Sequence, residues 1–111
     1  IVDEVVSKLI KNNLLNNIRF AEAYVSARKR KGFGPKKISY ELIAKGLLDK
    51  EIEGVLNDIG GWNQAALKVF KKKFPEGKSD DIKITLKQKN FLANRGFGFQ
   101  EIESVFGNDM L

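Results

Sequence analysis

The stretch LIAKGLLDKEIEGVL at residues 42–56 returns at residues 92–106 as LANRGFGFQEIESVF, fifty positions further along the chain. The two copies agree at apolar and glycine positions, where Leu42, Gly46, Leu47, Ile52, Val55 and Leu56 correspond to Leu92, Gly96, Phe97, Ile102, Val105 and Phe106. Lys45 and Arg95 place a cation before each glycine. Such a repeat predicts two similar units that bury apolar faces against their neighbours, whereas the alternative is a chance likeness between short helices.

Each copy ends a unit of three short helices. Apolar residues recur with the period of about 3.6 that is typical of a helix, and Pro35, Gly46 and Pro75 mark helix ends. Asp49 and Asn63 are the expected N-caps of two helices. We expect helices at about residues 16–31, 35–45, 49–59, 62–74 and 80–95 and a last one that carries residues 102–106, so that residues 16–60 form one three-helix repeat and residues 61–111 another.

Residues 1–15 carry a helical apolar stripe of their own from the start of the chain. Asn12 and Asn13 interrupt this pattern, and Asn16 or Asn17 can cap a new helix. We therefore expect residues 1–15 to be the last helix of a preceding repeat and the chain to be a piece of a longer protein. Because the units are joined in series without convincing strand alternation, the sequence predicts an all-α, elongated fold with no regular sheet.

The composition narrows the possible functions. Twenty Lys and Arg against fourteen Asp and Glu give a net charge of +6, which favours partners that carry phosphate or carboxylate groups. The chain has neither Cys nor His, which removes the usual zinc ligands and the commonest general base. We therefore expect no enzymatic activity, no metal and no cofactor. No apolar run approaches the roughly 20 residues of a membrane span, and we expect a cytoplasmic monomer.

The densest charge lies between residues 28 and 37, where six cations occur without an acid: Arg28, Lys29, Arg30, Lys31, Lys36 and Lys37. Cations in the last turn of a helix stabilise it through the helix dipole, which is a structural explanation for residues 28–31. Lys36 and Lys37 stand in a first turn, where the same dipole disfavours them. A patch that binds phosphate or acidic groups therefore explains the run better than a solvated face does.

The second unit carries a basic group at the equivalent place, the end of its first helix, formed by Lys68, Lys71, Lys72 and Lys73. Acids gather instead on the third helices, as Glu51, Glu53, Glu101 and Glu103. Trp62, Phe70 and Phe74 recur at helical spacing, so we expect a buried stripe rather than a surface that stacks on bases. Phe33, between two glycines, is either a core residue or an exposed contact.

The sequence resembles the RecX family of recombination regulators along a string of motif residues: Arg19-Phe20-Ala21, Arg28, Gly32-Phe33-Gly34-Pro35, Ile38, Glu41-Leu42, Lys45-Gly46 and Ile52. Phe91-Leu92, Arg95-Gly96-Phe97 and Ile102 resemble the closing repeat of that family. The resemblance covers nearly all of the chain and implies three tandem three-helix repeats in an elongated, curved molecule. Asn17 stands where the family commonly has Asp, a mild change because both residues cap helices, and most of the first repeat is missing.

The resemblance also implies binding within the groove of the RecA filament on DNA and inhibition of its ATP hydrolysis and strand exchange. We therefore predict a regulator of recombination and DNA repair that binds the RecA nucleoprotein filament and inhibits it. The alternative is a stand-alone basic DNA-binding module with helix-turn-helix-like units. Either function contacts single- or double-stranded DNA through its phosphates, and the candidate contact residues are Arg28, Lys29, Arg30, Lys31, Lys36, Lys37, Lys45, Lys71, Lys72 and Arg95.

Overall fold

The computed structural model describes the secondary structure of residues 2–107 and the side chains of residues 16–107. This part of the chain is helical and contains no strand. The helices are α1 (Val2–Arg30), α2 (Pro35–Ala44), α3 (Asp49–Ile59), α4 (Trp62–Lys73), α5 (Ile82–Asn94) and α6 (Phe99–Phe106). The all-α prediction is thereby confirmed over the described residues.

One helix boundary was predicted wrongly. The expected break at Asn12 and Asn13 does not occur, because α1 runs without interruption from Val2 to Arg30. An Asn in a helix interior costs at most about 0.7 kcal/mol relative to Ala, whereas Gly or Pro costs more, and neither of those residues occurs before Gly32. The side chains of residues 1–15 lie outside the described set, so their assignment to a preceding repeat stays a prediction.

The predicted repeat is confirmed in the turns between the second and third helix of each unit. Gly46 and Gly96 adopt positive φ angles of 95° and 101°, a conformation that L side chains resist. Each turn is closed in the same way: the Leu47 N–H donates to the Leu42 carbonyl at 3.2 Å, and the Phe97 N–H donates to the Leu92 carbonyl at 3.1 Å. The local backbone thus repeats along with the sequence.

The third helices also begin alike, although not at the expected residue. Leu48 and not Asp49 is the N-cap of α3, and the Glu51 carboxylate accepts from its backbone N–H at 3.1 Å. Glu101 accepts from the Gly98 N–H at 3.3 Å at the start of α6. The cap expected at Asn63 was also wrong, because the N-cap of α4 is Gly61, two residues earlier. Two of the acids on the third helices therefore serve to cap them.

The core consists of one apolar cluster in each unit. The first contains Ala21, Val25, Ile38, Leu42, Leu47, Ile52 and Val55, and the second contains Ala66, Phe70, Leu92, Phe97, Ile102 and Val105. Trp62 packs against both clusters, and its indole Nε1 donates to the Leu56 carbonyl at 2.9 Å. Phe70 is buried, and Trp62 and Phe74 are partly buried against the clusters, so the predicted stripe faces the core and Trp62 joins the two units.

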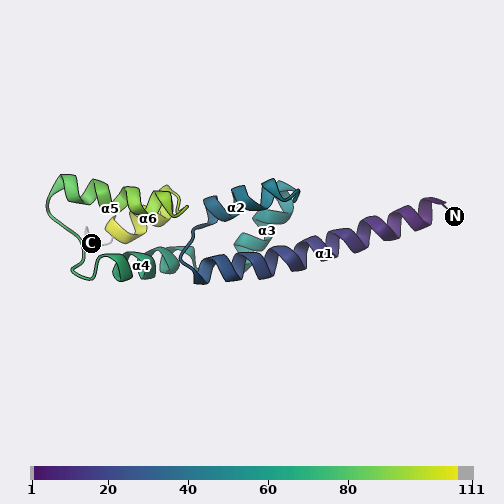
Figure 1. Ribbon diagram of the computed structural model, residues 1–111, viewed down its shortest axis with the longest axis horizontal. Helices are drawn as coiled ribbons and strands as arrows, with labels where there is room; N and C mark the ends of the chain where they lie inside the picture. Colours follow the sequence, from purple (N-terminus) through teal and green to yellow (C-terminus); the bar gives the residue numbers. More distant parts are fainter. Residues whose placement is uncertain (1, 108–111) are drawn as a thin grey trace.

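The molecule is elongated, as the serial units predict, and measures 67 × 25 × 19 Å along its principal axes. In Figure 1, α4 continues the direction of α1 along the longest axis, with α2 and α3 beside the later part of α1 and α5 and α6 beside α4. The N-terminal part of α1 projects beyond the first unit (Figure 1). This arrangement brings the end of α1 next to the start of α4.

Candidate nucleic-acid interface

The two units meet at a joint between two loops, residues 31–34 and residues 95–98. The Gly34 N–H donates to the Arg95 carbonyl at 2.8 Å, and the Lys36 N–H donates to the Gly96 carbonyl at 2.9 Å. A Cβ atom at Gly34 would overlap the Gly96 backbone, so only glycine permits this approach. We refer to these two loops together as the inter-unit joint.

Arg95 extends the inter-unit joint through its side chain. Its Nη2 donates to the Lys31 carbonyl at 2.7 Å and its Nε donates to the Gly32 carbonyl at 3.1 Å. These carbonyls follow the end of α1, where a cation is favoured by the helix dipole. The guanidinium also lies 4.3 Å from the centre of the Phe33 ring, so that Phe33 is a contact within the fold.

Arg28 is held inside the first unit. Its Nη2 and Nε donate to the Glu41 carboxylate at 2.7 and 3.0 Å, and its guanidinium lies 3.8 Å from the centre of the Phe33 ring. Burial acts to raise the pKa of Glu41, but hydrogen bonds from Arg28 and Tyr24 outweigh it, and the net pKa is lowered. Burial, followed by the bond to Glu41, raises the pKa of Tyr24. Arg28 therefore has a structural role.

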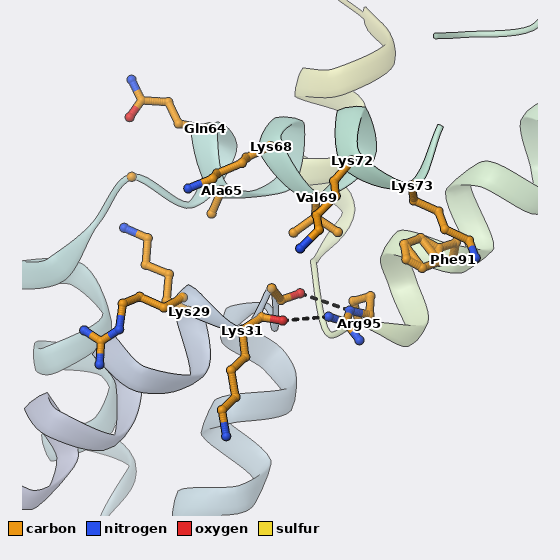
Figure 2. A pocket seen from close by; sticks show the side chains of 13 residues that line it. Lys29, Lys31, Gln64, Ala65, Lys68, Val69, Lys72, Lys73, Phe91 and Arg95 are labelled. Carbon is orange, nitrogen blue, oxygen red and sulfur yellow. Dashed lines mark hydrogen bonds between the residues drawn. The ribbon is translucent and has the colours of Figure 1, made fainter. Parts of the chain in front are cut away.

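A basic groove of about 750 Å³ runs between the end of α1 and α4. Seven cations line it: Lys29, Arg30, Lys31, Lys68, Lys72, Lys73 and Arg95. No carboxylate is among its lining residues, and apolar surface is supplied by Ala65, Val69 and Phe91. Figure 2 shows α4 on one side and the end of α1 on the other, with Arg95 bonded to two backbone carbonyls of the α1 side. Cations from both units thus face one concave surface.

Each of the two units matches the model of a known protein family. Residues 16–56 match the family model described as the second three-helix domain of RecX, and residues 63–106 match the one described as the third. The chain belongs to the RecX family. Both matches fall on three-helix units of the structure, since they cover the later part of α1 through most of α3 and then α4 through α6.

Individual RecX proteins resemble the chain over nearly its whole length. The regulatory protein RecX of Serratia proteamaculans is 34% identical over 108 residues, which are 96% of this chain and 64% of that protein. The regulatory protein RecX of Yersinia enterocolitica is 33% identical over 110 residues, covering 97% of this chain and 65% of that protein. The chain therefore spans somewhat less than two thirds of the length of these relatives.

Half of the predicted contact residues of this RecX-family chain line the basic groove: Lys29, Arg30, Lys31, Lys72 and Arg95. The others do not line it. Lys36, Lys37, Lys45 and Lys71 are exposed elsewhere on the surface, and Arg28 is bonded to Glu41. The groove adds Lys68 and Lys73, which the candidate set lacked. The signal for Lys68 is its helical spacing from Lys72, because residues four apart share one face of a helix.

Besides Arg28 and Arg95, Lys29 and Lys37 have contacts within the fold that the sequence did not reveal. The Lys29 ammonium donates to the Gly60 carbonyl at 2.8 Å and lies 5.3 Å from the centre of the Trp62 ring. Lys37 lies 5.0 Å from the centre of the Phe33 ring, and its charge helps to lower the pKa of Glu41. Lys37 is exposed like Lys36 but has these contacts within the fold, and the binding of a partner by either residue stays a prediction.

The described helices were also compared with the length and hydropathy of a membrane span. In the range that the structure describes, we find no helix with both the length and the apolar character needed to cross a bilayer.

Proposed function

We propose that this RecX-family chain regulates recombination by binding the RecA filament on DNA, with the basic groove against the DNA phosphates. The observation that carries this proposal is the groove itself, where seven cations from two structural units face one hollow without a carboxylate among its lining residues. A solvated basic face needs no such convergence. A chain of phosphates at regular spacing fits it, because each cation that neutralises a phosphate releases a counterion condensed on the DNA.

The availability of the groove cations supports this assignment. Lys68 and Lys72 extend from α4 in Figure 2, and both are exposed. Arg30, on the opposite side, is exposed at the end of α1. Lys29 and Arg95 have internal partners and hold the groove walls, so we assign most of the phosphate contact to the exposed cations. Neutralising a phosphate on a single strand lowers the slope of log K against log salt by about 0.7.

The elongated shape supports binding to a filament rather than to one compact partner. The chain extends for 67 Å along its long axis, so it can contact several neighbouring subunits or a length of DNA at once. Inhibition then follows from occupation: a chain lying along the filament hinders the movements that ATP hydrolysis and strand exchange require. We assign no catalytic step to the chain itself, and it acts by binding alone.

A titration distinguishes filament binding from coating of free DNA. RecA is assembled on single-stranded DNA at fixed salt, and its ATP hydrolysis is followed while the chain is added in amounts too small to cover the DNA. We expect inhibition under these conditions, and we expect it to persist when free DNA is added in excess. Inhibition that disappears with excess DNA would instead identify a general DNA-binding module. A reaction without RecA serves as the control for ATP hydrolysis by the chain itself.

A further inference from the structure

Arg95 belongs to two structures at once, since it lines the basic groove and also holds the inter-unit joint together. Different parts of the side chain serve the two roles. Its Nε and Nη2 point at the Gly32 and Lys31 carbonyls, while the side chain forms part of the groove lining (Figure 2). Lys45, the equivalent cation of the first unit, instead lies 5.5 Å from the centre of the Tyr24 ring.

The chemistry of the contact requires an arginine. A guanidinium presents donors in a fixed planar fork and stacks on aromatic rings, so one side chain can serve two successive carbonyls and Phe33 together. A lysine ammonium has the same charge but is a compact, strongly hydrated point on a flexible stem. Replacement of Arg95 by lysine therefore preserves the charge of the groove and removes the fork.

The units are otherwise connected through a short link between α3 and α4. Gly60 and Gly61 form this link, with φ angles of 59° and 69°, and Trp62 packs against both cores immediately after it. The joint contacts come from internal turns of the two units, between α1 and α2 and between α5 and α6, and Arg95 and Gly32 are 63 positions apart in the sequence. The link with Trp62 is one attachment and the joint is a second, and two separate attachments restrict rotation between the units more than one does.

We propose that Arg95 is a positioning residue that sets the orientation of the second unit relative to the first and thereby the width of the basic groove. One wall of the groove is the end of α1 and the other is α4, so a rotation between the units changes the distance between them. The consequence for filament affinity rests on the proposed function. The consequence for the orientation of the units does not.

Spin labels measure the orientation directly in the whole chain. The sequence contains no Cys, so Glu53→Cys on α3 and Asn90→Cys on α5, both at exposed positions, accept two labels specifically. Arg95→Lys is compared with Arg30→Lys, which makes the same chemical change at a groove residue that is exposed on α1. We expect a wider distribution of label distances in Arg95→Lys and the parent distribution in Arg30→Lys.

Affinity supplies the second readout. At one salt concentration, Arg95→Lys should bind the RecA filament about tenfold more weakly than Arg30→Lys, a difference of about 1.4 kcal/mol. The slope of log K against log salt should match that of Arg30→Lys, because the charge is retained. Phe33→Leu, which removes the ring beneath the guanidinium without changing charge, should also widen the distance distribution.

The outcomes separate the two proposals. An unchanged distance distribution in both Arg95→Lys and Phe33→Leu would overturn the positioning role, whatever happens to affinity. A loss of affinity with the parent distribution would make Arg95 a direct phosphate contact instead. If no variant and not even the parent binds the filament, the proposed function fails, while a widened distribution still supports Arg95 as the residue that orients the units.

Discussion

Alanine substitutions at Gly46 and Gly96 separate the strain of a turn from the contact between the units. Both glycines have positive φ angles, 95° and 101°, in equivalent turns. Around Gly46 there is nothing within 4 Å of an added Cβ, whereas at Gly96 the added atom would overlap the Lys37 Cβ and lie 2.8 Å from the Lys37 nitrogen. Only the second substitution therefore forces the inter-unit joint apart.

The structure sets the size of each effect. An L residue held in a left-handed conformation costs about 1–2 kcal/mol, which both variants share. Opening the joint at Gly96 also breaks the bonds from Gly34 to Arg95 and from Lys36 to Gly96. Each such bond contributes about 0.5–1.5 kcal/mol. We expect Gly46→Ala to destabilise by about 1–2 kcal/mol and Gly96→Ala by about 2–5 kcal/mol.

Urea denaturation followed by circular dichroism and by the fluorescence of Trp62, the single tryptophan, measures these differences. The fluorescence is informative because Trp62 packs against both cores. A thermal scan should show the same order, since a loss of 1 kcal/mol lowers the Tm of a small domain by about 4–8 °C. Equal losses of stability in the two variants would refute the joint as an energetic contact.

Three further predictions concern single charges. Glu41→Gln should destabilise by about 1–3 kcal/mol at pH 7, because it weakens the bond to Arg28. Since the pKa of Glu41 is lowered in the fold, its contribution to the free energy of unfolding is complete above its ordinary pKa of 4.5 and is lost as the pH falls through the lowered pKa. Urea denaturation across this range should show a flatter dependence of stability on acid pH in the variant. Identical pH profiles would contradict the stabilising role of the Glu41 carboxylate. Lys36→Glu should leave the Tm unchanged or raise it by the equivalent of about 0.3–1 kcal/mol while weakening filament binding. Lys37→Glu should lower the Tm, because the new carboxylate loses the contact with the Phe33 ring and is repelled by Glu41. If Lys36→Glu binds the filament as tightly as the parent at every salt concentration, Lys36 is not part of the contact surface.

Much of the fold follows from local sequence signals. The glycines at 46 and 96, Pro35 at the start of α2 and the apolar spacing of the two copies predict helix ends and turns that the structure contains. The errors arise where the sequence signal is weak. Asparagines at residues 12 and 13 disfavour a helix only slightly, and a side chain such as Glu51 can cap a helix in place of the expected Asp49.

The candidate site was predictable only in part. Runs of cations reveal the ends of α1 and α4, and their helical spacing indicates which of them share a face. The groove depends on a contact between loops far apart in sequence, where Gly34 pairs with Arg95, and no local pattern specifies that pairing. For the same reason the internal partners of Arg28, Lys29 and Lys37 became evident only from the folded chain.

Two matched charge reversals test the basic groove most directly. Lys68→Glu with Lys72→Glu changes the groove wall on α4, and Lys83→Glu with Lys87→Glu makes the same change in net charge at exposed positions on α5. Binding to preassembled RecA filaments is measured by fluorescence anisotropy over a range of salt concentrations, with circular dichroism to confirm folding. We expect the groove variant to lose affinity strongly and to have a salt slope that is shallower by about 1.4, as for the loss of two single-strand phosphate contacts, while the α5 variant stays close to the parent. Equal losses of affinity in the two variants, or parent-like binding by the groove variant, would contradict the assignment of the basic groove to DNA contact.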